Sequence, residues 1–120
     1  MSLTDLDERE QSVVKECVRA VVEGPFFPEW EFGTLFGLSR DKVRNILLSW
    51  PELDEADESV VLAINNTFNN LLGYPTPNKQ EIWAKFISVS GMELARVFDK
   101  WKGQPPRSSH KARDYFDDLM

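Results

Sequence analysis

The side chains that most often carry chemistry in proteins are sparse in this sequence. Its 120 residues include one cysteine, Cys17, and one histidine, His110. One histidine cannot form a histidine-based metal site. No histidine or basic cluster lies near Cys17 in the sequence, so nothing there would activate its thiol as a nucleophile. There is also no glycine-rich phosphate loop, no metal-ligand spacing and no pair of carboxylates in an apolar setting. We therefore expect no cofactor and no catalysis.

The charged groups that remain are mostly carboxylates, and they are unevenly placed. The formal net charge is −6, and residues 51–72 contribute −5 because they contain no lysine or arginine. The five acids of this block fall within seven positions and are Glu52, Asp54, Glu55, Asp57 and Glu58. Such a block is typical of a solvated loop or a helix N-terminus, or of a patch that steers a basic partner.

Residues 29–48 have the spacing of two short helices joined by a tight turn. Their sequence, EWEFGTLFGLSRDKVRNILL, resembles the helix-turn-helix motif of bacterial DNA-binding proteins. Gly33 stands where that motif needs a small residue, and Gly37 where it needs a left-handed turn. Apolar residues flank the turn and face back from the second helix, namely Phe36, Leu38, Val43 and Ile46. The resemblance implies a DNA-contacting surface made of Ser39, Arg40, Asp41, Lys42, Arg44 and Asn45.

The charge around this motif argues against DNA binding. Nucleic-acid affinity comes largely from contacts with phosphates, so DNA-binding domains usually have a basic face. Here the motif lies between residues 1–24, with a net charge of −3, and the block with −5. Unless these carboxylates turn away, they oppose the basic side chains across about one Debye length, roughly 8–10 Å. A dimeric helix-turn-helix regulator is therefore the alternative hypothesis, and nucleic acid is a disfavoured partner.

Four asparagines lie within six positions of a predicted helix, at Asn65, Asn66, Asn69 and Asn70. Each costs about half a kcal/mol relative to alanine in a helix interior, so helix propensity does not explain them. One interpretation is that Asn65 and Asn69, nearest the apolar face, bind the backbone of a neighbouring loop. The other is a polar recognition surface, in which Asn66 and Asn70 contact a partner.

Helices must position all of these side chains, because apolar residues recur at intervals of three and four along most of the chain. The first helix is predicted to begin near Thr4 and to end at Gly24, and an aromatic segment follows at residues 26–36. Further helices are predicted for residues 40–50, 58–72, 79–86 and 91–102, with Gly73 as a C-terminal cap. The alternation at residues 86–89 also allows a brief extended segment. The tryptophans are expected to anchor the core, at Trp30, Trp50, Trp83 and Trp101.

This length and pattern predict a single domain of the all-α class. We expect a compact bundle of five to six helices over residues 1–103 and a mobile tail over residues 104–120, which begins with Gln104-Pro105-Pro106. Apolar residues in the tail allow a short amphipathic turn, at Tyr115, Phe116, Leu119 and Met120.

The function that these features favour is binding. We expect a non-enzymatic protein–protein interaction module, such as a small acidic regulator or an immunity-type inhibitor of a basic partner. The residues expected to bind it are Glu52, Asp54, Glu55, Asp57, Glu58, Asn66 and Asn70. A cytoplasmic location without membrane contact is expected, because the N-terminus has no basic and apolar leader and no apolar run approaches roughly 20 residues. Residues 50–101 otherwise resemble small, acidic, uncharacterised bacterial proteins, a resemblance that implies no activity.

Overall fold

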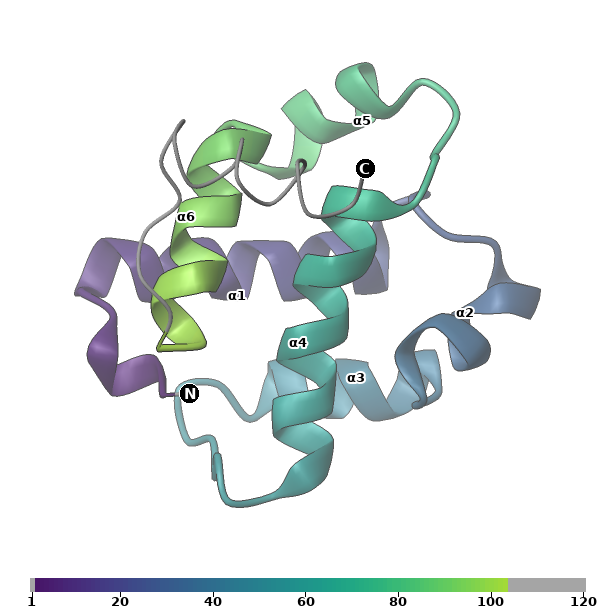
Figure 1. Cartoon of the computed structure of the whole chain (residues 1–120). Helices are drawn as coiled ribbons and strands as arrows, with labels where there is room; N and C mark the ends of the chain where they lie inside the picture. The colour runs from purple at the N-terminus through teal and green to yellow at the C-terminus, as the bar shows by residue number, and fades with distance from the viewer. Residues whose placement is uncertain (1, 104–120) are drawn as a thin grey trace, which may run out of the picture.

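Helices account for all the regular structure of the computed structural model, which describes residues 2–103. They are η1 (Leu3–Asp5, a 3-10 helix), α1 (Glu8–Glu23), α2 (Glu29–Phe36), α3 (Arg40–Leu48), α4 (Glu58–Gly73), α5 (Lys79–Phe86) and α6 (Gly91–Trp101) (Figure 1). No strand occurs among residues 2–103, and the predicted all-α class is confirmed. The extended segment allowed near residues 86–89 is limited to an irregular connection in which Ile87 has φ −125° and ψ 125°. The predicted tail over residues 104–120, with its amphipathic turn and His110, lies outside the described residues.

The N-terminal end of the chain differs from the sequence prediction. Thr4 does not cap the first long helix, because it lies inside η1, which Ser2 caps. Asp7 caps α1 instead, through a capping box. The Asp7 side chain accepts from the backbone N–H of Glu10, and the Glu10 side chain accepts from the backbone N–H of Asp7. The box satisfies two of the N–H groups that a helix start leaves unpaired, so α1 begins three residues later than Thr4 would place it.

The other helix boundaries follow local chemistry closely. Gly24 ends α1 and Ser39 caps α3 by accepting a hydrogen bond from the backbone of Lys42, both as predicted. Gly37, between α2 and α3, has φ +69°, a conformation that glycine adopts without strain. Gly73, however, is the last residue of α4 and not a left-handed cap, because the chain leaves the helix through an extended Tyr74.

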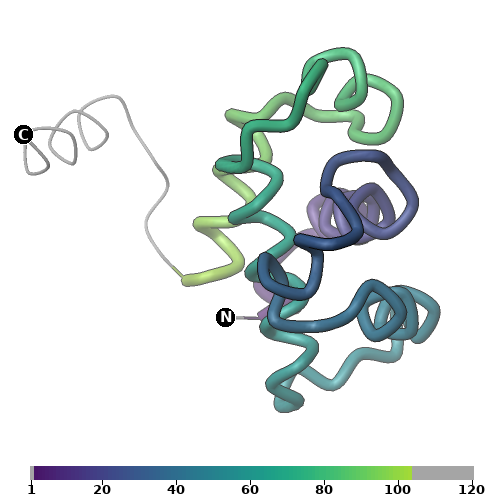
Figure 2. Tube along the Cα trace, turned by 90° about the vertical axis from the view of Figure 1, so that its right-hand side faces the viewer, coloured from purple at the N-terminus to yellow at the C-terminus, as the bar shows by residue number. Residues whose placement is uncertain are grey.

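Two long helices organise the core. In Figure 1, α4 crosses in front of α1, and Figure 2 shows α1 nearly end-on between α5 and α3. The buried apolar stripe of α1 consists of valines, Ala20 and Cys17, so the prediction that this cysteine is a small buried hydrophobe is confirmed. Phe68 of α4 stacks on Phe98 of α6 with ring centroids 4.8 Å apart, and Trp101 lies beside both rings.

The tryptophans do not all anchor this core. Trp101 is fully buried and Trp50 and Trp83 are half-buried, whereas the side chain of Trp30 is 80% exposed at the start of α2. The prediction of a core role was therefore wrong for Trp30.

No helix within residues 2–103 combines the length and the hydropathy that a membrane span requires.

A buried carboxylate joins the N-terminal helix to the C-terminal one. Glu10 of α1 is 2% exposed and accepts hydrogen bonds from Lys100 Nζ at 2.7 Å and Arg96 Nη2 at 3.1 Å, both on α6. Burial by itself would raise the pKa of Glu10, but the bonds from Lys100, the Asp7 backbone and Arg96 together lower it to about 2. Glu10 is therefore ionised in the folded protein and ties α1 to α6.

Candidate interaction surface

The acidic block forms the connection from α3 to α4 and the first turn of α4. Three of its carboxylates point to solvent without long-range partners, those of Glu52, Asp54 and Glu58. Asp54 makes one local bond, accepting from the Ala56 backbone at 2.9 Å through Oδ1. These three side chains are therefore placed as the steering hypothesis requires.

Glu55 has a different role. Its carboxylate accepts two hydrogen bonds from the backbone N–H of Leu3, at 2.9 and 3.1 Å, and one from Trp101 Nε1 at 3.3 Å. The side chain thus caps η1 and joins the α3–α4 connection to both ends of the described chain. The carboxylate of Glu55 is therefore engaged within the protein, unlike those of Glu52, Asp54 and Glu58, and its predicted role in steering a partner stays a prediction.

Asp57 caps α4 and is also exposed to solvent. Its Oδ1 caps α4 by accepting from the Ser59 backbone at 2.9 Å and from the Ser59 hydroxyl at 2.7 Å. These two bonds, and then the charge of Lys42, hold the pKa of Asp57 below its ordinary value. Asp57 is therefore a fixed negative charge at the protein surface.

A hollow of about 260 Å³ lies between α3 and the acidic connection. Its lining includes three carboxylates, from Glu52, Asp54 and Asp57, and one cation, from Lys42. Apolar and neutral polar side chains complete it, from Ile46, Leu53, Val60, Asn45, Ser49 and Ser59. Apolar surface suits the aliphatic stem of a lysine or arginine, and the carboxylates suit its charged head. We call the hollow together with Glu58 the acidic corner.

The side chain of Arg40 is engaged within the protein. Its side chain is only 15% exposed, and its guanidinium donates to the carbonyls of Val21 and Val22 at 2.9 Å each. It also donates to the Phe27 carbonyl at 3.3 Å and pairs with Glu29 at 2.7 Å. These bonds satisfy carbonyls at the end of α1 that the helix leaves unpaired. The expectation that Arg40 is exposed was therefore wrong.

The rest of the set implied by the helix-turn-helix resemblance is exposed, apart from the half-buried Arg44. Arg44 pairs with Asp41 within α3 at 2.5 Å, and Ser39 uses its hydroxyl as the cap. Lys42 and Asn45 line the acidic hollow. Carboxylates of the acidic block thus lie beside Lys42, and Arg44 pairs with an acid of its own helix.

The two glycines of that motif behave differently from each other. Gly37 has the left-handed backbone that the turn requires. A Cβ at Gly33 would meet nothing within 4 Å, so no helix crosses closely there. The main packing partners of α2 and α3 are α4 and α1, respectively.

The asparagines of α4 hold the C-terminal end of α2. Asn66 Nδ2 donates to the Phe36 carbonyl at 2.8 Å, and Asn70 Nδ2 donates to the Leu35 carbonyl at 3.0 Å. The interpretation in which asparagines bind neighbouring backbone thus applies to a different pair from the one expected, because Asn69 is exposed. Asn66 and Asn70 are one helical turn apart, which is the spacing that could have indicated a shared target.

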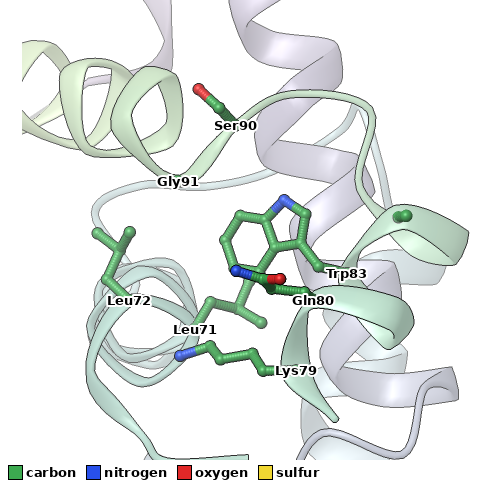
Figure 3. Close-up of a pocket in the computed structure, with 8 residues that line it drawn as sticks. Leu71, Leu72, Lys79, Gln80, Trp83, Ser90 and Gly91 are labelled. Atoms are coloured by element: carbon green, nitrogen blue, oxygen red, sulfur yellow. The ribbon is translucent and has the colours of Figure 1, made fainter.

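Sequence reasoning missed a groove at the other end of α4. It holds about 330 Å³ and is lined by Leu71, Leu72, Lys79, Gln80, Trp83, Ala84, Ser90 and Gly91. Figure 3 shows Trp83 and Leu72 on facing sides, with Lys79 along one edge. Lys79 Nζ donates to the Tyr74 carbonyl at 2.9 Å, and burial lowers the pKa of this lysine. The Trp83 indole is fixed by its bond to the Val89 carbonyl at 2.7 Å. We call this site the α4–α6 groove.

Between Ser2 and Gly103 no three histidine, cysteine or acidic side chains are arranged to hold a metal ion. Burial raises the pKa of the Cys17 thiol far above its ordinary value, which removes it as a nucleophile. Comparison of the chain with protein-family models, with curated proteins and with solved structures finds no match.

Proposed function

We propose that this chain is a non-enzymatic protein–protein interaction module whose acidic corner binds a basic partner, in the manner of a small acidic regulator or an inhibitor. The observation that carries the proposal is the composition of the hollow, in which three carboxylates and an apolar lining lie together. An arginine or lysine side chain is the protein group that matches both parts of that lining.

The contact residues of this proposal are narrower than the sequence suggested. They are Glu52, Asp54, Asp57 and Glu58, each of which is exposed. Glu55, Asn66 and Asn70 are left out, because their polar groups are engaged within the protein. Clustered exposed charges of one sign accelerate association with an oppositely charged surface, and the effect weakens with salt.

We do not propose DNA binding, because no contact made by the residues of α3 favours it over protein binding at the acidic corner. Arg40 is engaged with the end of α1, and Lys42 lies among carboxylates. Binding of the full chain to a random-sequence duplex pool at low salt would reverse this preference.

Affinity capture with charge variants tests the proposal. The full chain and the variant Glu52→Gln/Asp54→Asn/Glu58→Gln are immobilised and exposed to lysate of the source cell at low and moderate salt. Asp57 is kept because it caps α4. We expect the wild-type chain to retain basic proteins that the variant loses, with retention that falls as salt rises.

The control carries the same change of net charge elsewhere on the surface. Glu8→Gln/Glu23→Gln/Glu81→Gln alters three exposed acids of α1 and α5. It should retain the same proteins as the wild-type chain. If the acidic-corner variant also retains them, or if the control loses them equally, binding does not depend on this site.

A further inference from the structure

Exposed apolar side chains border the acidic corner where α3 ends. Leu48, in the last turn of α3, is 74% exposed, and Pro51, in the turn that follows, is exposed as well. We call these two side chains the apolar rim. We propose that the partner binds the acidic corner through a short segment that carries a basic side chain for the hollow and an apolar side chain for the rim. This inference rests on the function proposed above and narrows the class of partner.

The rim and the hollow form one continuous surface, because their residues alternate along the chain. Ser49 and Glu52 line the hollow, and a hydrogen bond from the Glu52 N–H to the Ser49 carbonyl at 2.8 Å closes the turn between them. Leu48 precedes this turn and Pro51 lies within it. Leu48 is also one helical turn from the lining residue Asn45, a spacing at which Cβ atoms lie about 5–6 Å apart. A segment of a few residues can therefore contact both parts of the surface.

The packing of the protein does not account for the position of Leu48. The hydrophobic core of residues 2–103, together with the partly buried side chains packed against it, includes Leu47 and Trp50 but not Leu48. Single exposed leucines are common on protein surfaces and by themselves indicate nothing. Leu48 differs because it borders a hollow with apolar lining, and it extends the apolar contact area of that site.

The electrostatics at the end of α3 favours a cation beside the rim. The carbonyl end of a helix has partial negative charge, and α3 has no basic side chain in its last turn. Glu52 adds a full negative charge directly after Pro51. Lys42, the cation of the lining, lies near the start of α3, about two turns from Ser49. A basic side chain that enters the hollow at this end therefore meets negative charge, and an apolar neighbour in the same segment meets the rim.

The affinity of the full chain for two matched peptides tests the inference. One peptide is a short arginine peptide with leucine at every third position, and the other has serine in place of each leucine, so that both have the same charge. The Kd of each is measured from the amide shifts of residues that line the hollow. We expect the leucine peptide to bind the wild-type chain about fivefold more tightly, because its contact with the rim removes apolar surface from water.

Two variants locate the apolar contact. Leu48→Ser should lose most of the preference for the leucine peptide and bind the serine peptide as the wild-type chain does. Met92→Ser is the matched control, because Met92 is 86% exposed on α6 and lies outside the core as Leu48 does. This control should keep the full preference for the leucine peptide.

The outcomes distinguish this inference from the function on which it rests. Equal affinity of the wild-type chain for the two peptides, a preference that is unchanged in Leu48→Ser, or one that is lost in Met92→Ser would each overturn the inference. Shifts at the hollow with both peptides would still support the acidic corner in those cases. If neither peptide shifts the residues that line the hollow, the proposed function fails and the inference fails with it.

Discussion

The substitution Glu10→Gln tests the ion pairs that join α1 to α6. Glutamine keeps the size of the side chain and a carbonyl oxygen that can accept from the Asp7 backbone, so the capping box is retained in part. The change removes the charge that Lys100 and Arg96 contact. The variant therefore isolates the contribution of the buried charge.

The expected size of the effect follows from the pKa of Glu10. The folded protein lowers it from its ordinary value of 4.5 to about 2. A depressed carboxylate pKa stabilises the folded state above the unfolded value and loses that contribution as the pH falls toward the folded one. A difference of this size corresponds to at most about 3 kcal/mol at pH 7. Because the side chains of Lys100 and Arg96 are 44% and 41% exposed, they remain hydrated in the variant and add little further cost.

Urea unfolding monitored by circular dichroism measures this difference at several pH values. We expect Glu10→Gln to lower the free energy of unfolding by roughly 2–3 kcal/mol at pH 7, with the gap to wild type narrowing between about pH 5 and pH 2. The control is Glu8→Gln, which alters an exposed carboxylate on the same turn of α1 and should change stability by less than about half a kcal/mol. A gap that is absent at pH 7, or that stays constant down to pH 2, would refute the reasoning.

Five further substitutions test three other features of the fold, each by the change in urea midpoint at constant m-value. Gly37→Ala should cost about 1–2 kcal/mol because its φ is +69°, whereas Gly33→Ala, in an open helix interior, should stabilise by roughly 0.5–1 kcal/mol. Arg40→Lys should lower the free energy of unfolding by about 1–2 kcal/mol, because an ammonium group cannot reproduce the hydrogen bonds of the guanidinium to the carbonyls of Val21, Val22 and Phe27. Asn70→Ala should cost about 1 kcal/mol by leaving a carbonyl of α2 unpaired, and Asn69→Ala at an exposed position should be neutral or slightly stabilising. Equal effects within the glycine pair or within the asparagine pair, or a neutral Arg40→Lys, would contradict these assignments.

The helices could be predicted because their boundaries depend on neighbours in the sequence. Residues 79–86 and the cap at Ser39 were predicted as they occur, and Gly24 ends α1 as its position indicated. The first helix was misplaced for the same reason. Ser2, Thr4 and Asp7 are all good N-caps, and the choice depends on a reciprocal bond with Glu10 that only one of them makes.

The candidate site was less predictable, because the contacts of each charged side chain depend on residues far away in the sequence. Glu55 and its neighbour Asp54 have similar chemistry, yet Glu55 binds Leu3, 52 positions away, and Asp54 faces solvent. Arg40 has the position of a DNA-contacting residue, but the end of α1 lies within its reach. No periodicity or local propensity contains this information.

Amide chemical shifts of the full chain, titrated with a short oligo-arginine peptide at low salt, test the role of the acidic corner most directly. We predict that the largest shifts fall on residues lining the hollow, such as Asn45, Leu53 and Ser59. These shifts should be lost in Glu52→Gln/Asp54→Asn/Glu58→Gln and kept in the control that alters α1 and α5. Shifts spread evenly over all exposed carboxylates, or shifts at the hollow that the triple substitution leaves unchanged, would contradict the account.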